Sequence, residues 1–235
     1  MTASSHLSDN LKLLAHETDQ LVRTAEGLDD AAIREASLCA GWTRAHVLSH
    51  LARNADASGR LVGWAKTGTP VAMYESPQAR DAEIEAGSTR SAAEILTDLE
   101  SSSARFALRA AGLSGPPEIC QVETRAGNKV RGAQLPTLRL LEVVFHHVDL
   151  NAGYTFAEAD PGFVKRAISN AVERLRASGQ VPALSLAGDD GETWSIGDGA
   201  KDVNGNNAAL LLWLARGGEA GVSSADALLK LPAWG

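Results

Sequence analysis

Glu142 and His146 lie four residues apart in the most apolar run of the chain, which extends from Leu135 to Leu150. A carboxylate and an imidazole at positions i and i+4 project from the same face of a helix. The rest of this run is so apolar that the helix must be largely buried, and buried ionisable groups are costly unless they are paired or bind a cation. At about 100° per residue, Arg139 and Asp149 fall in the same sector of the helix. A narrow polar stripe on an apolar helix indicates half of a site.

A second pair with the same spacing, His46 and His50, lies in another predicted helix. If the two helices face each other across a common core, one of these histidines joins Glu142 and His146 in a site of two histidines and one carboxylate. Such a site holds Zn²⁺ with coordination positions left for water or substrate, and the same ligands also serve non-haem Fe²⁺. Asp149 is then placed to orient His146 or a bound group. The spacing therefore predicts a divalent-metal site, and it leaves open which histidine and which metal take part.

Other polar residues in these segments have plainer explanations. His147 is rotated by about 100° from His146 and is predicted to pack or to face solvent. Cys39 could be a reactive thiol, but buried cysteines are more often inert. We therefore predict that Cys39 and Cys120 both lie outside the site, and their spacing indicates neither a metal knuckle nor a disulfide framework.

Helical periodicity dominates up to about residue 178, and its boundaries carry the usual capping residues. The first helix is predicted to end near Gly27, and the second to begin after Thr43 and end at Gly68. The third follows Ser91, and the fourth has Pro136 in its first turn, where the missing N–H costs least. Residues 71–87 are expected to form a loop with a short helix, and the segment before Pro136 is expected to be irregular. Four long helices with an apolar interior predict a bundle.

The last third of the chain has a different pattern. Asp160-Pro161 is predicted to open a further helix, and residues 181–186 and 193–196 alternate like strands joined by a hairpin at 188–191. Asn204-Gly205 is predicted to be a turn, followed by a helix over 208–215. The expected fold class is mainly α in two domains, a metal-binding bundle over 1–155 and a small α+β domain over 156–235.

Composition limits the classes of function. The chain has 235 residues, of which 44% are hydrophobic, enough for one large core or two modest ones. A net charge of −7 argues against nucleic acid or an anionic membrane surface as the main partner. No apolar run approaches the roughly 18 residues that span a bilayer, and no signal-peptide pattern follows Met1. We expect a soluble, cytoplasmic protein.

Three segments, in chain order, resemble the signature of the mycothiol-dependent maleylpyruvate isomerase family. They are Gly-Trp-Thr-Arg-Ala-His-Val-Leu-Ser-His-Leu-Ala-Arg-Asn-Ala at 41–55, Pro-Val-Ala-Met-Tyr-Glu-Ser-Pro-Gln-Ala-Arg-Asp-Ala-Glu-Ile-Glu-Ala-Gly-Ser at 70–88, and Glu-Val-Val-Phe-His-His-Val-Asp-Leu at 142–150. The resemblance implies a DinB-like four-helix bundle that binds a metal, followed by a C-terminal α+β domain similar to sterol-carrier folds.

The resemblance also implies roles for particular residues. It makes His50, Glu142 and His146 the zinc ligands and His46 a neighbour. The family places a functional arginine in a Gly-Arg pair near the end of the last helix. This chain reads Trp-Leu-Ala-Arg-Gly-Gly at 213–218, so the Gly-Arg pair is not reproduced. Arg216 is the candidate for the family's arginine, displaced by one residue. A cation that interacts with the helix dipole is the other interpretation of Arg216.

The activity that the resemblance implies is conversion of maleylpyruvate to fumarylpyruvate, with Zn²⁺ and mycothiol or another low-molecular-weight thiol as cofactors. A thiolate adds to the alkene, rotation follows about the resulting single bond, and elimination returns the thiol. An ordinary thiol has a pKa of about 8.5, and coordination to Zn²⁺ deprotonates it. Because the substrate is anionic, Arg80 and Arg216 are predicted to bind it, although Arg80 could also be a solvated surface residue.

Three alternatives remain at this stage. The first is an S-transferase or isomerase that uses another thiol or electrophile. The second is a zinc hydrolase with Asp149 as the general base. The third is a non-enzymatic protein whose C-terminal domain binds a hydrophobic small molecule. The expected partners are a small anionic substrate and a thiol, with no nucleic acid and no membrane, and the chain is expected to be a monomer.

Overall fold

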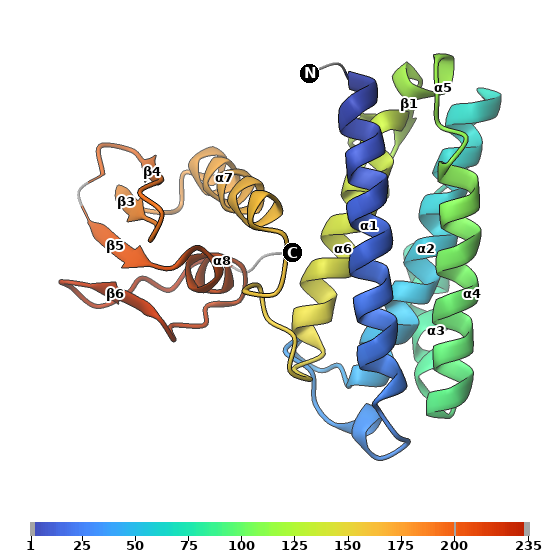
Figure 1. The fold of residues 1–235 in the computed structure, drawn as a ribbon, viewed down its shortest axis with the longest axis horizontal. Coiled ribbons are helices and arrows are strands. Elements are labelled where there is room, and N and C mark those ends of the chain that lie inside the picture. The colour runs from blue at the N-terminus through green and yellow to red at the C-terminus, as the bar shows by residue number, and fades with distance from the viewer. Residues whose placement is uncertain (1–2, 200, 233–235) are drawn as a thin grey trace. The chain divides into compact units, whose positions relative to one another are not determined.

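The computed structural model describes residues 3–199 and 201–232. The chain divides into two compact units, Met1–Gly153 and Tyr154–Gly235. The first unit is helical apart from one small hairpin, and the second combines helices with a four-stranded sheet (Figure 1). This organisation confirms the predicted fold class, mainly α with a small α+β part.

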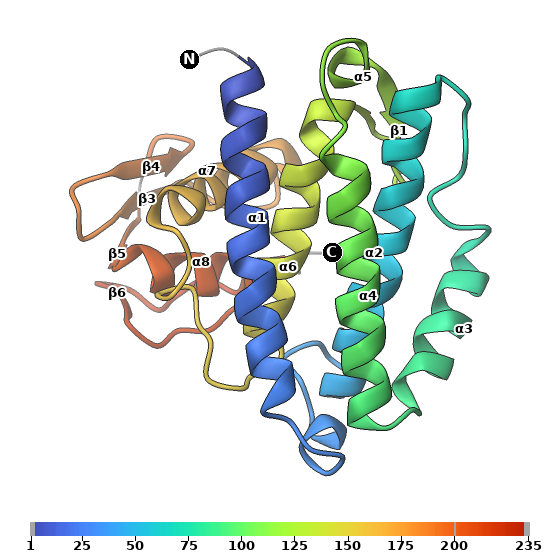
Figure 2. The same cartoon turned by 45° about the vertical axis from the view of Figure 1, so that its right-hand side comes forward.

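Four long helices of the first unit form a bundle. Its helices are α1 (Ala3–Glu26), α2 (Arg44–Thr67), α4 (Ala92–Ala110) and α6 (Leu135–Asp149). Helices α1 and α2 each pack against both α4 and α6, so α1 and α2 lie at diagonal positions. In Figure 2, α1 and α6 run in one direction while α2 and α4 run in the other. The beginning of α2 therefore lies beside the end of α6.

Local sequence signals explain most of these helix boundaries. Thr43 is the N-cap of α2, and Gly68 ends that helix in the left-handed conformation, at a φ of 73°. Ser91 Oγ accepts a hydrogen bond from the Glu94 N–H, while the Glu94 carboxylate accepts one from the Ser91 N–H. This reciprocal capping box fixes the start of α4. Pro136 lies in the first turn of α6, as predicted.

The connections of the first unit contain more structure than the sequence predicts. Helix α3 (Pro77–Ser88) packs against α2, where a loop with only a short helix is expected (Figure 2). The segment predicted to be irregular contains the short helix α5 (Pro116–Ile119) and a hairpin of β1 (Gln121–Glu123) and β2 (Lys129–Arg131). Strands of three residues are too short to produce a recognisable alternation of apolar and polar residues, which is why the hairpin is missed.

The second unit contains two helices and one sheet. The helices are α7 (Pro161–Ser178) and α8 (Asn207–Arg216), and the sheet order is β4 (Thr193–Ile196), β3 (Leu184–Ala187), β5 (Asp202–Gly205) and β6 (Val222–Ser224). Strand β3 is antiparallel to β4 and parallel to β5, and β5 is antiparallel to β6. The helices pack against each other and against the sheet. The predicted helix after Asp160 and the predicted hairpin are both confirmed.

The predicted turn at Asn204-Gly205 is wrong, because both residues belong to β5. Asn204 pairs with Ser223 and Gly205 pairs with Val222 in the antiparallel register. A Cβ atom on Gly205 would lie 2.8 Å from the Gly221 carbonyl oxygen. A glycine is therefore required at this position by the close approach of two strands rather than by a turn.

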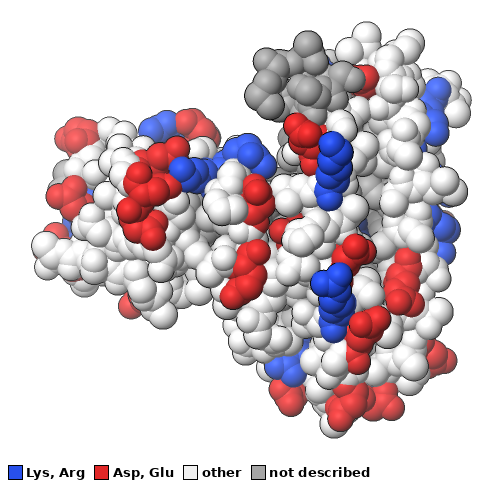
Figure 3. Space-filling model, viewed as in Figure 1, with Lys and Arg blue, Asp and Glu red and all other residues white. Residues whose placement is uncertain are grey.

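The surface carries both signs of charge. On the face shown in Figure 3, basic side chains are scattered among acidic ones. Within the described residues, no helix combines the length and the apolar composition that crossing a membrane requires.

Candidate metal centre

Three predicted ligands meet where α2 begins and α6 ends. His50 projects from α2, Glu142 and His146 project from α6, and their ligand atoms all lie within 4.8 Å of one another. His50 Nε2 is 2.9 Å from Glu142 Oε2, and His146 Nε2 is 3.6 Å from the same oxygen. The antiparallel packing of α2 and α6 brings together residues that are 92 positions apart in sequence. Two imidazole nitrogens and one carboxylate oxygen thus converge on one place, which we call the His-Glu-His triad.

The surroundings of the triad set its protonation states. Burial is the main reason why the pKa of His50 falls to about 4, and the hydrogen bond to Glu142 offsets only part of this effect. His50 is therefore neutral at pH 7, as a metal-binding imidazole must be. Burial alone would raise the pKa of Glu142, but the hydrogen bond from His50 and electrostatic interactions with His50, His146 and Arg139 together lower it to about 2. Glu142 is therefore ionised at pH 7.

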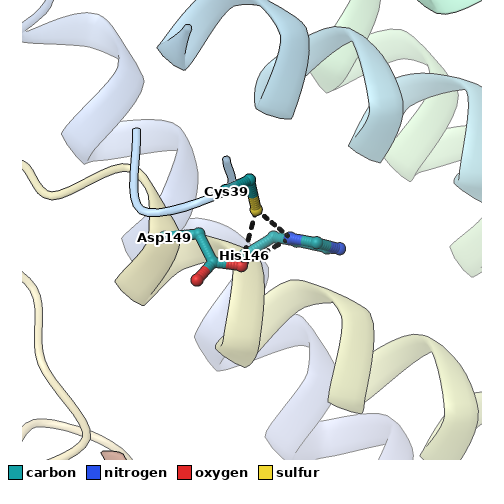
Figure 4. Close-up of side chains that lie close together, drawn as sticks. All are labelled: Cys39, His146 and Asp149. Atoms are coloured by element: carbon teal, nitrogen blue, oxygen red, sulfur yellow. Dashed lines mark hydrogen bonds and ion pairs between the residues drawn. The ribbon is translucent and has the colours of Figure 1, made fainter. Parts of the chain in front are cut away.

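His146 is oriented by Asp149, one turn further along α6. Its Nδ1 atom lies 2.8 Å from Asp149 Oδ2, and the Asp149 side chain is fully buried (Figure 4). A carboxylate at this place favours the tautomer with the proton on Nδ1, which leaves the Nε2 lone pair directed towards the triad. Asp149 thus lies where it can orient His146. Asp149 contacts the Nδ1 side of the ring, whereas Glu142 lies on the Nε2 side.

Arg80 reaches the triad from α3. Its Nη2 atom is 3.3 Å from His50 Nδ1, and its guanidinium carbon is 5.8 Å from the centre of the Tyr74 ring. Its Nη1 atom also forms an ion pair with the exposed Asp81 at 2.7 Å. Only 14% of the Arg80 side chain is exposed, so the solvated-surface interpretation does not describe it. A positive charge therefore lies immediately beside one of the triad histidines.

Comparison with known proteins agrees with this geometry. The family model for the mycothiol maleylpyruvate isomerase N-terminal domain matches residues 14–151, more than half of the chain, and includes the whole triad and Arg80. The chain belongs to this family. The resemblance found in the sequence is thereby confirmed.

Two solved structures are similar to the chain over nearly its whole length. One is a crystal structure of the mycothiol-dependent maleylpyruvate isomerase, with 30% identity and a TM-score of 0.91. The other is a histidine-to-alanine mutant of the mycothiol-dependent maleylpyruvate isomerase, with 29% identity and a TM-score of 0.91. Each covers 97% of this chain and 97% of its own. No curated protein matches the chain.

His46 lies next to the triad of this family member, but both of its ring nitrogens are engaged elsewhere. The Thr43 N–H donates a hydrogen bond to His46 Nδ1 at 3.2 Å, and Thr43 Oγ1 lies 2.7 Å from the same nitrogen. His46 Nε2 is 3.2 Å from both Ser88 Oγ and Glu85 Oε2. His46 is thus held by the cap of α2 and by the end of α3. These contacts favour His50 over His46 as the ligand from α2.

The prediction that both cysteines lie outside the site is wrong for Cys39. Its Sγ atom is 3.2 Å from Asp149 Oδ2 and 3.9 Å from His146 Nδ1 (Figure 4). The loop that carries it is fixed to the end of α6, because the Leu38 N–H donates to the Asp149 carbonyl at 2.8 Å. Residue spacing cannot reveal a contact between positions 110 residues apart. Cys120, in contrast, follows α5, and its thiol contacts the carbonyl oxygen of its neighbour Gln121.

Trp42, from the same loop, was not predicted to take part in the site. Its ring centre is 5.5 Å from that of His50 and 6.3 Å from that of His46. His147 points away from the triad, as predicted, and its Nε2 lies 2.7 Å from Thr24 Oγ1 on α1. Trp42 therefore packs beside the ligand from α2, and His147 belongs to the contact between α1 and α6.

One helical turn from the triad, two more polar residues are buried in the bundle. Arg139 is only 2% exposed, and its Nη1 donates a hydrogen bond to Asn54 Oδ1 at 2.8 Å. Arg139 was on the predicted stripe of α6 but had no predicted role. Asn54 was missed, although its position four residues after His50 puts it on the same face of α2. Tyr74 lies in the loop before α3, and no periodicity or residue spacing marks it as a neighbour of the site.

Arg216 is the last residue of α8, in the second unit. Gly217 follows it in the left-handed conformation, at a φ of 72°, and ends the helix. Its Nη1 atom donates to the Ala215 carbonyl at 3.0 Å. Its predicted role in substrate binding stays a prediction.

Proposed function

We propose that this chain is a metal-dependent isomerase that converts maleylpyruvate to fumarylpyruvate by reversible addition of a low-molecular-weight thiol, namely mycothiol. The observation that carries the proposal is the convergence of the His-Glu-His triad, with a neutral His50 and an ionised Glu142, within a fold shared with a mycothiol-dependent maleylpyruvate isomerase. The triad lies inside the segment that matches the family model.

The residues present fit a divalent metal ion. Two imidazoles and one carboxylate are a common catalytic zinc ligand set, and a buried carboxylate behind one histidine is its usual support. The Glu142 side chain is 37% exposed, so ligands from solvent have access to the triad. We propose Zn²⁺ as the metal, with Fe²⁺ as the alternative that the same ligands serve. Zinc bound there would keep a thiol deprotonated at neutral pH.

The chain's own residues would then stabilise the charge that moves during the reaction. When a thiolate adds to the alkene, a C–S bond forms and the electron pair of the double bond moves to the conjugated carbonyl oxygen as an enolate. Rotation about the new single bond follows, and return of the electron pair expels the thiolate. Arg80 is placed beside His50 to stabilise the enolate or a substrate carboxylate. We propose Arg216 as a second cation for the substrate.

The zinc-hydrolase alternative requires Asp149 as the general base, and the position of Asp149 argues against this role. Asp149 is fully buried, and the Oδ2 atom that contacts His146 also accepts a hydrogen bond from the Cys39 thiol. A carboxylate held in this way has no route to a water molecule on the open side of the triad. A thiol S-transferase with another electrophile would use the same metal and thiol, and only the choice of substrate distinguishes it. We further propose that the protein is a cytoplasmic monomer.

The test is a turnover assay with zinc-loaded protein and maleylpyruvate. Conversion to fumarylpyruvate is followed without thiol and then with mycothiol, glutathione or ergothioneine, and Glu142→Ala protein serves as the control. We expect turnover with mycothiol and none without a thiol. Failure to convert maleylpyruvate with any thiol, in protein that retains stoichiometric metal, would refute the proposal. Hydrolysis of an ester without thiol would instead support the hydrolase.

A further inference from the structure

A buried cation without an ion-pair partner lies one helical turn below the triad. Arg139 Nη1 donates to Asn54, but Nη2 is buried and has no hydrogen-bond partner. Among the residues that the structure describes, no carboxylate forms an ion pair with this guanidinium, although Glu142 is near enough for its charge to raise the pKa of Arg139. Burial lowers that pKa to about 10, so Arg139 remains charged at pH 7. Buried charges are costly unless they are paired.

A second unsatisfied donor lies in the same place. Tyr74 is 8% exposed, and its hydroxyl is buried without a hydrogen-bond partner. Burial, followed by the charge of Glu142, raises the pKa of this hydroxyl, so it keeps its proton, and interactions with Arg80 and Asn54 offset part of this effect. Arg60 donates two hydrogen bonds to the carbonyl of Met73, at 3.0 and 2.8 Å, and thereby fixes the backbone next to Tyr74. Two donors from different parts of the chain therefore lack an acceptor near the same metal ligand.

The charges around the triad indicate what the missing acceptor is. The carboxylates around the triad are Glu142, Asp149 and the exposed Asp81, which pairs with Arg80, and the cations are Arg80 and Arg139. A divalent metal ion would leave this group with a net positive charge. An anion that accepts hydrogen bonds would reduce this charge and also satisfy the two donors.

We propose that the Tyr74 hydroxyl and the Arg139 guanidinium, together with Arg80, form a subsite for one carboxylate group of the substrate. This inference rests on the proposed function, whose substrate is a dicarboxylate. The carboxylate enters past the partly exposed Glu142 side chain, and Arg80 moves off the Tyr74 ring to admit it. Arg80 belongs to α3, outside the four helices of the bundle, so this movement leaves the bundle core unchanged.

Calorimetric titration of the zinc-loaded protein with maleate, a cis-dicarboxylate that needs no turnover, tests the subsite. Tyr74→Phe is the sharpest variant, because it removes a single buried hydroxyl and keeps the ring that packs beside Arg80. If Tyr74 were purely structural, this change would leave maleate binding unaltered and would not lower stability. We expect roughly tenfold weaker binding of maleate to Tyr74→Phe and to Arg139→Gln, the size of effect that a hydrogen bond to a charged group gives.

Controls separate this subsite from general effects and from the proposed function. Arg90→Gln removes an arginine that is half exposed and paired with Asp98, and it should bind maleate like the wild type. Metal content is measured in every variant, and Tyr74→Phe decides the matter if Arg139→Gln does not fold. Wild-type affinity for maleate in Tyr74→Phe, or no binding to the wild type, would overturn the subsite even if the enzyme isomerises maleylpyruvate. Weaker binding in Tyr74→Phe would support the subsite even if maleylpyruvate is not converted.

Discussion

The carboxylate of Asp149 and the imidazole of His146 form a hydrogen bond of 2.8 Å on the side of the ring that faces away from Glu142. His146 Nε2 is 3.6 Å from Glu142 Oε2, so the ring lies between two carboxylates. Asp149 accepts a hydrogen bond from the Nδ1–H of His146, and Nε2 remains available for a metal ion. The tautomer of one proposed ligand therefore depends on a residue that does not reach the metal.

Asp149→Asn should weaken zinc binding by about 10-fold to 100-fold, the usual cost of losing such a support. The amide is similar in size but carries no charge, and its NH2 group would meet the His146 N–H or the Cys39 thiol. Competition with a chromophoric chelator measures the affinity. Asp98→Asn is the matched control, because Asp98 pairs with Arg90 and does not contact the triad. Equal affinities in the two variants would show that Asp149 does not support the metal site.

Glu142→Ala and His146→Ala should each abolish stoichiometric metal binding and isomerisation together. Each change removes one of three donors, and the two that remain hold a divalent ion poorly. His46→Ala should keep its metal, because both ring nitrogens of His46 are engaged by other residues. Metal analysis after dialysis gives the result directly. Full metal content in Glu142→Ala and His146→Ala would place the site elsewhere, and loss of metal in His46→Ala would mean that His46 is the ligand.

Local signals made much of the fold predictable. Thr43, Ser91 and Asp160 were predicted to start helices, and each is an N-cap in the structure. The side chains of Ser91 and Asp160 accept hydrogen bonds from backbone N–H groups three residues later, and Thr43 contacts the His46 ring three residues later, so these signals are local in the sequence. The Asn204-Gly205 pair failed as a signal because pairing with β6, which is distant in sequence, decides its conformation.

The candidate site was predictable only in part. Two pairs at i and i+4 on apolar helices indicated a metal site, but the spacing treats His46 and His50 alike. The distinction comes from the cap of α2, where Thr43 engages His46. Cys39 reaches Asp149 through a loop that docks on α6, and such a contact depends on the tertiary fold.

Acid should destabilise the metal-free protein partly through His50. Its pKa is about 4 in the folded chain, against its usual value of 6.5, because burial disfavours the charged ring. Between these two values the unfolded state binds the proton and the folded state does not. The free energy of unfolding should therefore be constant above about pH 6.5 and should fall as the pH drops towards 4, by up to about 3 kcal/mol from this group.

Urea denaturation of the metal-free wild type and of His50→Gln, between pH 4.5 and 8, measures this contribution. Other groups titrate in both proteins, so the difference between the two curves isolates His50. The difference in the free energy of unfolding between the wild type and the variant should become smaller as the pH falls below 6.5. Parallel curves would contradict the prediction.

Cys39→Ser should keep thiol-dependent turnover, because the reacting thiol comes from the small molecule and a hydroxyl can still donate to Asp149. Cys39→Val removes this donor, so we expect a few-fold weaker zinc binding from a less firmly held Asp149. Cys120→Val is the matched control and should leave zinc affinity unchanged. Loss of turnover in Cys39→Ser with metal retained would show that Cys39 itself takes part in the chemistry.

Gly87→Ala should loosen α3, the helix that carries Arg80. A Cβ atom at Gly87 would lie 2.9 Å from both Cβ and Oγ of the buried Ser49 on α2, so the two helices have to separate slightly. Overpacking of this kind costs about 1–3 kcal/mol of stability. Gly63→Ala, on α2, meets nothing within 4 Å and should instead stabilise the helix by roughly 0.5–1 kcal/mol. Urea denaturation compares the two variants, and equal stabilities would mean that Gly87 does not set the contact between α2 and α3.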